Sequence, residues 1–227
     1  NIQYRKLRRW VLPALLGAAL STLAIIPTLA ADAQSTVNTA TVTATEQVTT
    51  PPAQISTPPN GTPTGMAPHA EVDPSTFKGT TVVTEDKSIA HELIKNTTAD
   101  QNAFIGTNKA VINIENSVFD KTGNTTSDDN SNFRGQNAVV LGIEGSQINI
   151  KGSNITSNSN GSNAVFATGE GSVINVENTN IHTKSDSSRG LDATYKGIVN
   201  GKNLTITTEG AHSATLATDR GEGTITA

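Results

Sequence analysis

The sequence contains no cysteine, and aromatic residues make up only 4% of its 227 residues. Without cysteine, neither disulfide bonds nor a zinc site built from thiolates can stabilise the fold. With so few aromatic residues, an ordinary globular core of large apolar side chains is not expected for a chain of this length. We therefore expect stability to come from many small contacts that repeat along the chain.

A long apolar run is also missing. Residues 11–26 are apolar, but this stretch is shorter than the roughly 20 residues of a membrane-spanning helix. Basic residues precede it, Pro27 follows it, and small residues with Ala31 and Ala33 come next. This layout is typical of a secretory signal peptide, so we predict that residues 1–33 are cleaved. A retained membrane anchor is the alternative.

Basic residues are scarce in the part that remains. Removing residues 1–33 leaves 12 basic and 19 acidic residues, a net charge of −7. No basic cluster is left, which argues against nucleic acid as a partner. We expect a secreted or cell-surface protein, bacterial in origin. We also expect the sequence to be a fragment cut at both ends, so that it meets a membrane only through an anchor that it does not include.

Low complexity marks residues 34–76, where seven of the nine prolines lie between Pro51 and Pro74 among many Thr and Ser. This composition predicts a disordered linker. Residues 77–98 are transitional and are predicted to form an N-terminal cap or a first irregular coil. In this segment "TTVV" predicts a strand, whereas "DKSIAHELIK" fits either one or two helical turns or an irregular coil.

Residues 99–227 repeat a pattern of three short strands separated by Gly, Asn and Ser. The first strands are "NAFIGT", "NAVVLG", "NAVFAT", "RGLDAT" and "SATLAT", the second are "VINIE", "QINIK", "VINVE" and "GIVNG", and the third are "NSVFD", "SNITS", "TNIHT" and "LTITT". Three strands in every 24–26 residues predict one turn of a solenoid, because stacked coils bury a core that no single coil can bury. The fold class is therefore all-β, a three-walled parallel β-helix.

Period-two alternation sets the expected register of the second strands. We predict that Ile112, Ile148 and Ile174 point inward and stack within one wall. Asn113, Asn149 and Asn175 should point outward and form an amide ladder. Aligning the repeated strands also predicts two further columns. Thr168, Thr194 and Thr218 align as a Thr ladder, while Ile155, Ile181 and Ile206 should line the third wall.

The pattern in "LDATYKGIVNGKNLTITT" resembles the right-handed parallel β-helix repeats of pertactin-like passenger domains of bacterial autotransporters and adhesin-like surface proteins. The resemblance covers residues 99–227. It implies a right-handed helix and an adhesive or structural role outside the cell, with glycans or proteins of a host surface or matrix as partners. A pectin lyase-like enzyme acting on polysaccharides is one alternative, and a spacer that carries a domain outside this fragment is another.

Two places break the repeat and are the candidates for a specific site. One is the insertion at 120–136, where Asp128 and Asp129 form the only adjacent acidic pair of the repeat region; we interpret them as a solvated loop, with calcium binding as a lesser possibility. The other is an outward stripe of the first wall, aligned as Val140, Phe166, Asp192 and Leu216, which could form a shallow interaction groove. No catalytic residue, metal ligand or cofactor is predicted.

Overall fold

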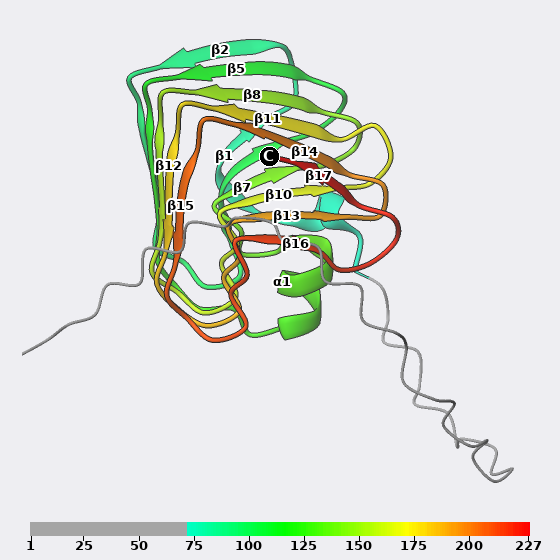
Figure 1. Ribbon diagram of the computed structural model, residues 1–227. Helices are drawn as coiled ribbons and strands as arrows, with labels where there is room; N and C mark the ends of the chain where they lie inside the picture. The colour runs from blue at the N-terminus through cyan, green and yellow to red at the C-terminus, as the bar shows by residue number, and fades with distance from the viewer. Residues whose placement is uncertain (1–71) are drawn as a thin grey trace, which may run out of the picture. The chain divides into compact units, whose positions relative to one another are not determined.

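A computed structural model describes residues 72–227, and it shows a parallel β-solenoid of about six turns with three sheets (Figure 1). The predicted signal peptide (1–33) and all of the predicted linker up to residue 71 lie outside the described residues. A short 3₁₀-helix, η1 (Pro74–Thr76), precedes the first coil, and the side chain of Asp73 caps it by accepting a hydrogen bond from the Ser75 amide at 2.9 Å.

Each of the first five coils contributes one strand to each sheet, the last described coil contributes strands to sheets A and B, and every pairing between neighbouring coils is parallel. Sheet A contains β1 (Gly79–Val83), β4 (Asn102–Gly106), β7 (Val140–Gly142), β10 (Val165–Thr168), β13 (Leu191–Thr194) and β16 (Leu216–Thr218). Sheet B contains β2 (Lys87–Ala90), β5 (Val111–Glu115), β8 (Gln147–Lys151), β11 (Val173–Glu177), β14 (Ile198–Lys202) and β17 (Thr224–Thr226). Sheet C contains β3 (Leu93–Asn96), β6 (Val118–Lys121), β9 (Asn154–Ser157), β12 (Asn180–Thr183) and β15 (Thr205–Thr208).

The segment 77–98 joins the solenoid as its first coil. Strands β1, β2 and β3 pair with β4, β5 and β6, respectively. The helical alternative for "DKSIAHELIK" is therefore not what the chain forms. Parallel pairing to the next coil satisfies the backbone of this segment, which a single helical turn could not do as fully.

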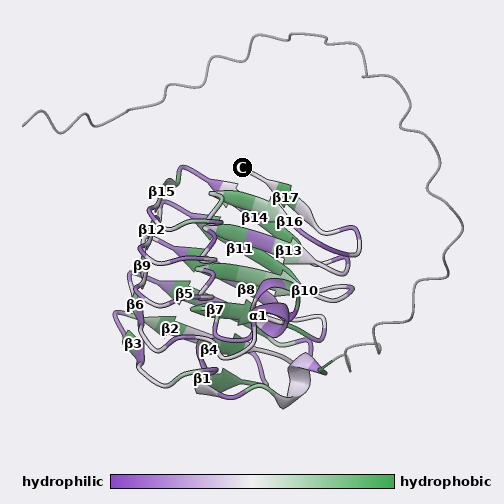
Figure 2. Cartoon of the chain, turned by 90° about the horizontal axis from the view of Figure 1, so that it is seen from below, coloured by the Kyte–Doolittle hydropathy of each residue, from purple (hydrophilic) through white to green (hydrophobic). Residues whose placement is uncertain are grey.

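Apolar side chains at alternate strand positions point inward and fill the interior. Figure 2 shows hydrophobic residues in green along the strands. Ile112 pairs in register with Ile148, and Ile148 with Ile174, so the predicted stack within one wall is confirmed. Ile155, Ile181 and Ile206 are likewise in register on sheet C, with the last only partly buried because it lies on the terminal strand.

Residues in the left-handed region turn the chain from sheet B to sheet C. Asn116, Gly152, Asn178 and Asn203 stand at this corner with φ between 48° and 61°. Only Gly and, among the other residues, chiefly Asn and Asp tolerate this conformation. The Asn or Gly just after β5, β8, β11 and β14 therefore suits the geometry of the corner, and His91 takes the same conformation after β2, with φ 59°.

Candidate functional site

The outer face of sheet A is covered by a second buried cluster, separate from the interior. Its members are Phe77, Ile105, Ala138, Leu141, Ile143 and Phe166, with Val72 packed against them. These side chains alternate with those that point into the solenoid, so strands β4, β7, β10 and β13 of sheet A are buried on both faces. The cover comes from the segment before β1 and from the insertion at 120–136, which contains helix α1 (Asp128–Arg134) (Figure 1).

Helix α1 was not predicted, yet its ends carry ordinary helix signals. Ser127 is the N-cap, and its side chain accepts from the Asn130 amide at 3.4 Å. Gly135 ends the helix in the left-handed region at φ 78°. A Cβ at Gly135 would lie 2.5 Å from Leu141 Cδ1 and 2.7 Å from Phe166 Cδ1. Glycine is therefore required here both for the backbone turn and for close packing on sheet A.

Hydrogen bonds fix α1 to three successive coils. The Ser131 hydroxyl donates to the Gly161 carbonyl at 2.7 Å, and the Asn163 amide donates to the Ser131 carbonyl at 3.2 Å. The Thr194 hydroxyl donates to the Phe133 carbonyl at 3.0 Å. Because these bonds are buried or partly buried, they specify one position of the helix on the sheet.

Asp192 lies beneath this cover with no exposed surface. It pairs in register with Phe166 of the preceding coil, and neither carboxyl oxygen accepts a hydrogen bond from a described residue. Loss of solvation raises the pKa of Asp192 to about 8, a shift that Arg189 opposes and Asp219 increases. Asp192 is therefore a mostly protonated carboxyl at neutral pH.

Arg189 joins the elements around Asp192. Its Nε lies 3.8 Å from Asp192 Oδ2, and its terminal nitrogens reach Asn132 Oδ1 of α1 at 2.8 Å and Asp219 Oδ2 at 3.2 Å. The guanidinium of Arg220 lies 3.7 Å from the ring centre of Phe133. These contacts hold α1 against β13 and against the loop after β16. The guanidinium groups of Arg189 and Arg220 are therefore engaged in contacts within the protein.

A buried lysine, Lys121, holds the start of the insertion. Lys121 is fully buried, and its ammonium donates to the carbonyls of Thr98 and Gly123 at 3.0 Å each and to that of Thr122. Burial lowers the pKa of Lys121 to about 8, which the nearby charge of Asp100 opposes. The ammonium thus replaces water as the partner of three carbonyls where the chain leaves the solenoid.

The predicted outward stripe differs from the observed one by a slip of one residue in two coils. Leu216 pairs with Leu191 and so belongs to the column facing inward, while Asp192 pairs with Ala217. Val140 likewise pairs with Val165, and Leu141 takes the place beside Phe166. The Thr ladder is shortened for the same reason. Thr194 donates to Thr168 at 2.8 Å, but Thr218 pairs with Ala193.

The candidate residues therefore occupy different environments. Phe166 and Asp192 are fully buried under the cover, whereas Leu216 is 45% exposed on the terminal strand of sheet A. Asp128 and Asp129 are exposed in the first turn of α1, where carboxylates favour the helix dipole. The first wall thus offers no open groove at Phe166 and Asp192.

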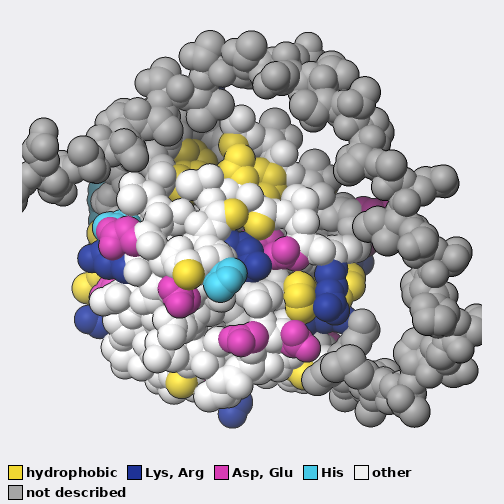
Figure 3. Space-filling model, turned by 60° about the horizontal axis from the view of Figure 1, so that its bottom comes forward, with side chains coloured by type: hydrophobic (Ala, Val, Ile, Leu, Met, Phe, Trp, Pro, Cys, Tyr) yellow, Lys and Arg dark blue, Asp and Glu magenta, His cyan; other side chains and the backbone are white. Residues whose placement is uncertain are grey.

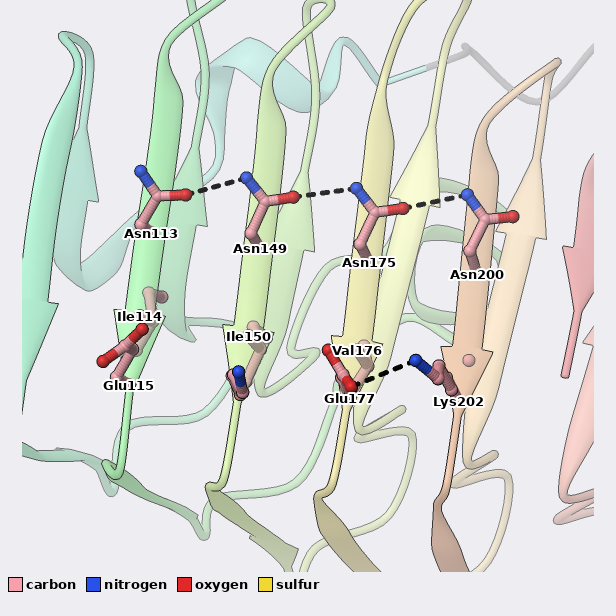
Figure 4. A pocket seen from close by; sticks show the side chains of 12 residues that line it. Asn113, Ile114, Glu115, Asn149, Ile150, Asn175, Val176, Glu177, Asn200 and Lys202 are labelled. Carbon is pink, nitrogen blue, oxygen red and sulfur yellow. Dashed lines mark hydrogen bonds and ion pairs between the residues drawn. The ribbon is translucent and has the colours of Figure 1, made fainter.

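The outer face of sheet B is open and carries a groove of about 350 Å³ that crosses four coils (Figure 4). Along it the amides of Asn113, Asn149, Asn175 and Asn200 form a ladder. Each amide nitrogen donates to the oxygen of the preceding coil, at 2.9 Å for Asn149 to Asn113, 2.8 Å for Asn175 to Asn149 and 2.9 Å for Asn200 to Asn175. The predicted amide ladder is confirmed, and Asn200 extends it by one coil.

Two residues further along each strand, charges of alternating sign form a second column. Glu115, Lys151, Glu177 and Lys202 pair in register in that order. Lys202 Nζ lies 3.3 Å from Glu177 Oε1. A third column, at the starts of the strands, consists of Val111, Gln147, Val173 and Ile198. The charge column could have been read from the sequence, because the charged residue follows the Asn at the same interval in these four coils.

The described residues do not gather a metal-binding group, since residues 72–227 contain no cluster of three or more His, Asp or Glu arranged to hold an ion. None of the helices within 72–227 has the length and apolar character needed to cross a membrane. On the face that Figure 3 shows, acidic and basic side chains are interspersed among uncharged ones. The open groove of sheet B is therefore the best candidate for a binding surface.

Searches against family models, curated proteins and solved structures find no match to this chain. The likeness to pertactin-like passengers thus remains a resemblance in the repeat pattern.

Proposed function

We propose that this chain is an exported β-helix, displayed on or released from a bacterial surface, with an adhesive or structural role toward glycans or proteins of a host surface or matrix. The observation that carries the proposal is the groove of sheet B, an open surface that is lined by Asn, Glu and Lys side chains and is continuous over four coils. The layout of residues 1–33 and the Pro- and Thr-rich tract that follows support export and display at the end of a stalk.

The chemistry of the groove suits hydroxyl-rich or peptide ligands. A side-chain amide has two N–H donors and an oxygen with two lone pairs. The ladder uses one donor and one lone pair of each inner Asn, such as Asn149 and Asn175, so half of that capacity remains. Regular spacing of about 4.8 Å between coils repeats the same groups along the groove, which favours extended ligands over compact ones.

Binding is tested with the whole chain on arrays of glycans and matrix proteins. The Asn149→Ala/Asn175→Ala variant removes the centre of the ladder and should weaken binding at least tenfold. A matched control is Asn154→Ala/Asn180→Ala, which removes another exposed amide pair, bonded at 3.2 Å on sheet C. Equal losses in both variants, or no ligand for the parent chain, would contradict an adhesive groove and favour the spacer function.

Export is tested separately by expressing the chain in a bacterium and following it into the periplasm and medium. We expect a product that begins after Ala33, and a variant lacking residues 1–33 should stay in the cytoplasm. Retention of the parent chain in the cytoplasm would refute the proposal that it is exported.

A further inference from the structure

The charge column of sheet B is complementary to itself in reverse order: when the order of its four residues is reversed, every position changes sign. Along the solenoid the order is Glu115, Lys151, Glu177 and Lys202, one residue per coil. A second copy running in the opposite direction would present Lys202, Glu177, Lys151 and Glu115. Each carboxylate would then face an ammonium. Two copies running in the same direction would instead have their strands reversed, so the charge column of each copy would face the column of Val111, Gln147, Val173 and Ile198 in the other.

We propose that the outer face of sheet B pairs with the same face of a second copy of this chain, with the two solenoids antiparallel. The symmetry axis runs parallel to the strands and passes between the coils of Lys151 and Glu177. This operation keeps each column opposite its own copy and reverses the order of coils, as a two-fold symmetric interface requires. The contact is thus fully charge-complementary without any rearrangement of the four coils.

The amide column supports the same orientation. The ladder runs in one direction, so it ends with the amide nitrogen of Asn113 at one end and the amide oxygen of Asn200 at the other. In the antiparallel pair Asn113 of one copy faces Asn200 of its partner. The amide nitrogen of Asn113, which donates to no other Asn of the ladder, then faces the amide oxygen of Asn200, which accepts from none. The dipoles of the two ladders point in opposite directions.

The column at the starts of the strands, which is mostly aliphatic, would lose exposed apolar area when the two copies pair. Val111 would face Ile198 of the second copy, and Gln147 would face Val173. Val111 is 38% exposed, whereas the inward Ile112 beside it is fully buried. Burying such half-exposed aliphatic groups contributes roughly 25 cal/mol per Å² of area removed from water.

The size of the face fixes the strength of the contact. Four strands about 4.8 Å apart and five residues long, at about 3.3 Å per residue, cover roughly 300 Å² on each copy. A stable dimer generally buries about 800 Å² per partner. The pair is therefore weak and depends on salt, and it gains strength where many copies are held together on one surface.

This inference goes beyond the proposed function, because two copies can pair in solution without export and without a foreign ligand. A foreign ligand and a second copy compete for the same face, but each is measured in the absence of the other, so the two proposals can fail independently.

The decisive variant is Glu177→Lys/Lys202→Glu. It keeps the net charge and reverses the ion pair between the two residues without removing it. Its column reads Glu, Lys, Lys, Glu, which places like charges opposite each other in the antiparallel pair. By sedimentation equilibrium of the whole chain at low salt, we expect the dimer of the parent chain to weaken at least tenfold in this variant. A parent chain that stays monomeric at millimolar concentration, or an unchanged dimer in the variant, would overturn the proposal.

A matched control, Lys151→Glu/Glu177→Lys, also exchanges two charges but gives the order Glu, Glu, Lys, Lys. This order remains complementary when reversed, so the dimer should persist. Circular dichroism confirms that each variant is folded before it is compared. Loss of the dimer in both folded variants would show that the exchange itself, and not antiparallel complementarity, causes the effect, and would refute the proposal.

Orientation is tested with single cysteines, which are unique because the chain has none. Asn113→Cys and Asn200→Cys variants are treated with a short bis-maleimide, separately and mixed. Antiparallel pairing predicts efficient cross-linking only in the mixture. Equally efficient cross-linking within the Asn113→Cys protein alone would indicate parallel pairing and overturn the inference.

Discussion

The outer faces of sheets A and B have the same strand spacing, but that of sheet A is covered and that of sheet B is open. On sheet A the alternate residues are apolar, with a single carboxyl, and the insertion carrying α1 covers them. On sheet B the corresponding residues of four coils form one column of amides, one of alternating charges and one of mostly aliphatic side chains, and the face stays open. In this solenoid an irregular segment makes a second core, whereas strict repetition makes a surface whose groups recur every coil.

The largest expected effect comes from emptying the second core. Phe166→Ala removes a fully buried ring from beneath α1, where Gly135 packs against it. Deleting a buried Phe side chain costs about 3–5 kcal/mol in the free energy of unfolding, because a cavity remains. Urea denaturation followed by circular dichroism measures the change.

The matching truncation on sheet B is Val111→Ala, at a residue that is 38% exposed. It should cost less than about 1 kcal/mol, since little apolar area is lost. If the two truncations cost the same, the outer face of sheet A is not a packed core.

Asp192, which lies beneath the same cover, should make the stability of the fold depend on pH. Its pKa is 3.8 in the unfolded chain and about 8 in the folded protein, so the folded state holds the proton more tightly. The stabilisation is complete below pH 4, falls by at most about 1.4 kcal/mol per pH unit as pH rises, and is lost above pH 8. Asp192→Asn cannot ionise, so its stability should fall less steeply from pH 4 to 8 and exceed that of the parent chain at pH 8.

Denaturation at several pH values checks this expectation. Identical slopes for the parent chain and Asp192→Asn would contradict a buried, protonated carboxyl beneath the helix.

The same contrast explains what could be predicted from the sequence. The register of sheet B follows from "INI" and "INV", because a polar Asn between two inward residues permits only one alternation. Strands of sheet A such as "VVLG" are buried on both faces, so their sequences show no alternation of polar and apolar residues. For this reason the predicted register of sheet A is wrong by one residue at Val140 and at Leu216. The insertion was recognised by its length. Its helix was not, because seven mostly polar residues show no apolar periodicity.

A smaller effect is expected from breaking the amide ladder. Asn149→Ala removes the bonds to Asn113 and from Asn175, both on an open face. A hydrogen bond contributes about 0.5–1.5 kcal/mol net, and water can replace an exposed partner, so we expect a total loss of about 1 kcal/mol. Denaturation midpoints measure it. A loss as large as that of Phe166→Ala would mean that the ladder, and not the apolar interior, holds this wall together.

The smallest effect should come from Glu177→Gln, which breaks the ion pair with Lys202. The Lys202 side chain is 79% exposed, and pairs of this kind contribute about 0.2–1 kcal/mol. The loss should fade in 1 M salt, where charges are screened within about 3 Å. Lys202→Gln should cost the same, and the double variant should cost little more than either single one, because both remove the same interaction. An additive double variant would show that each charge acts through other partners.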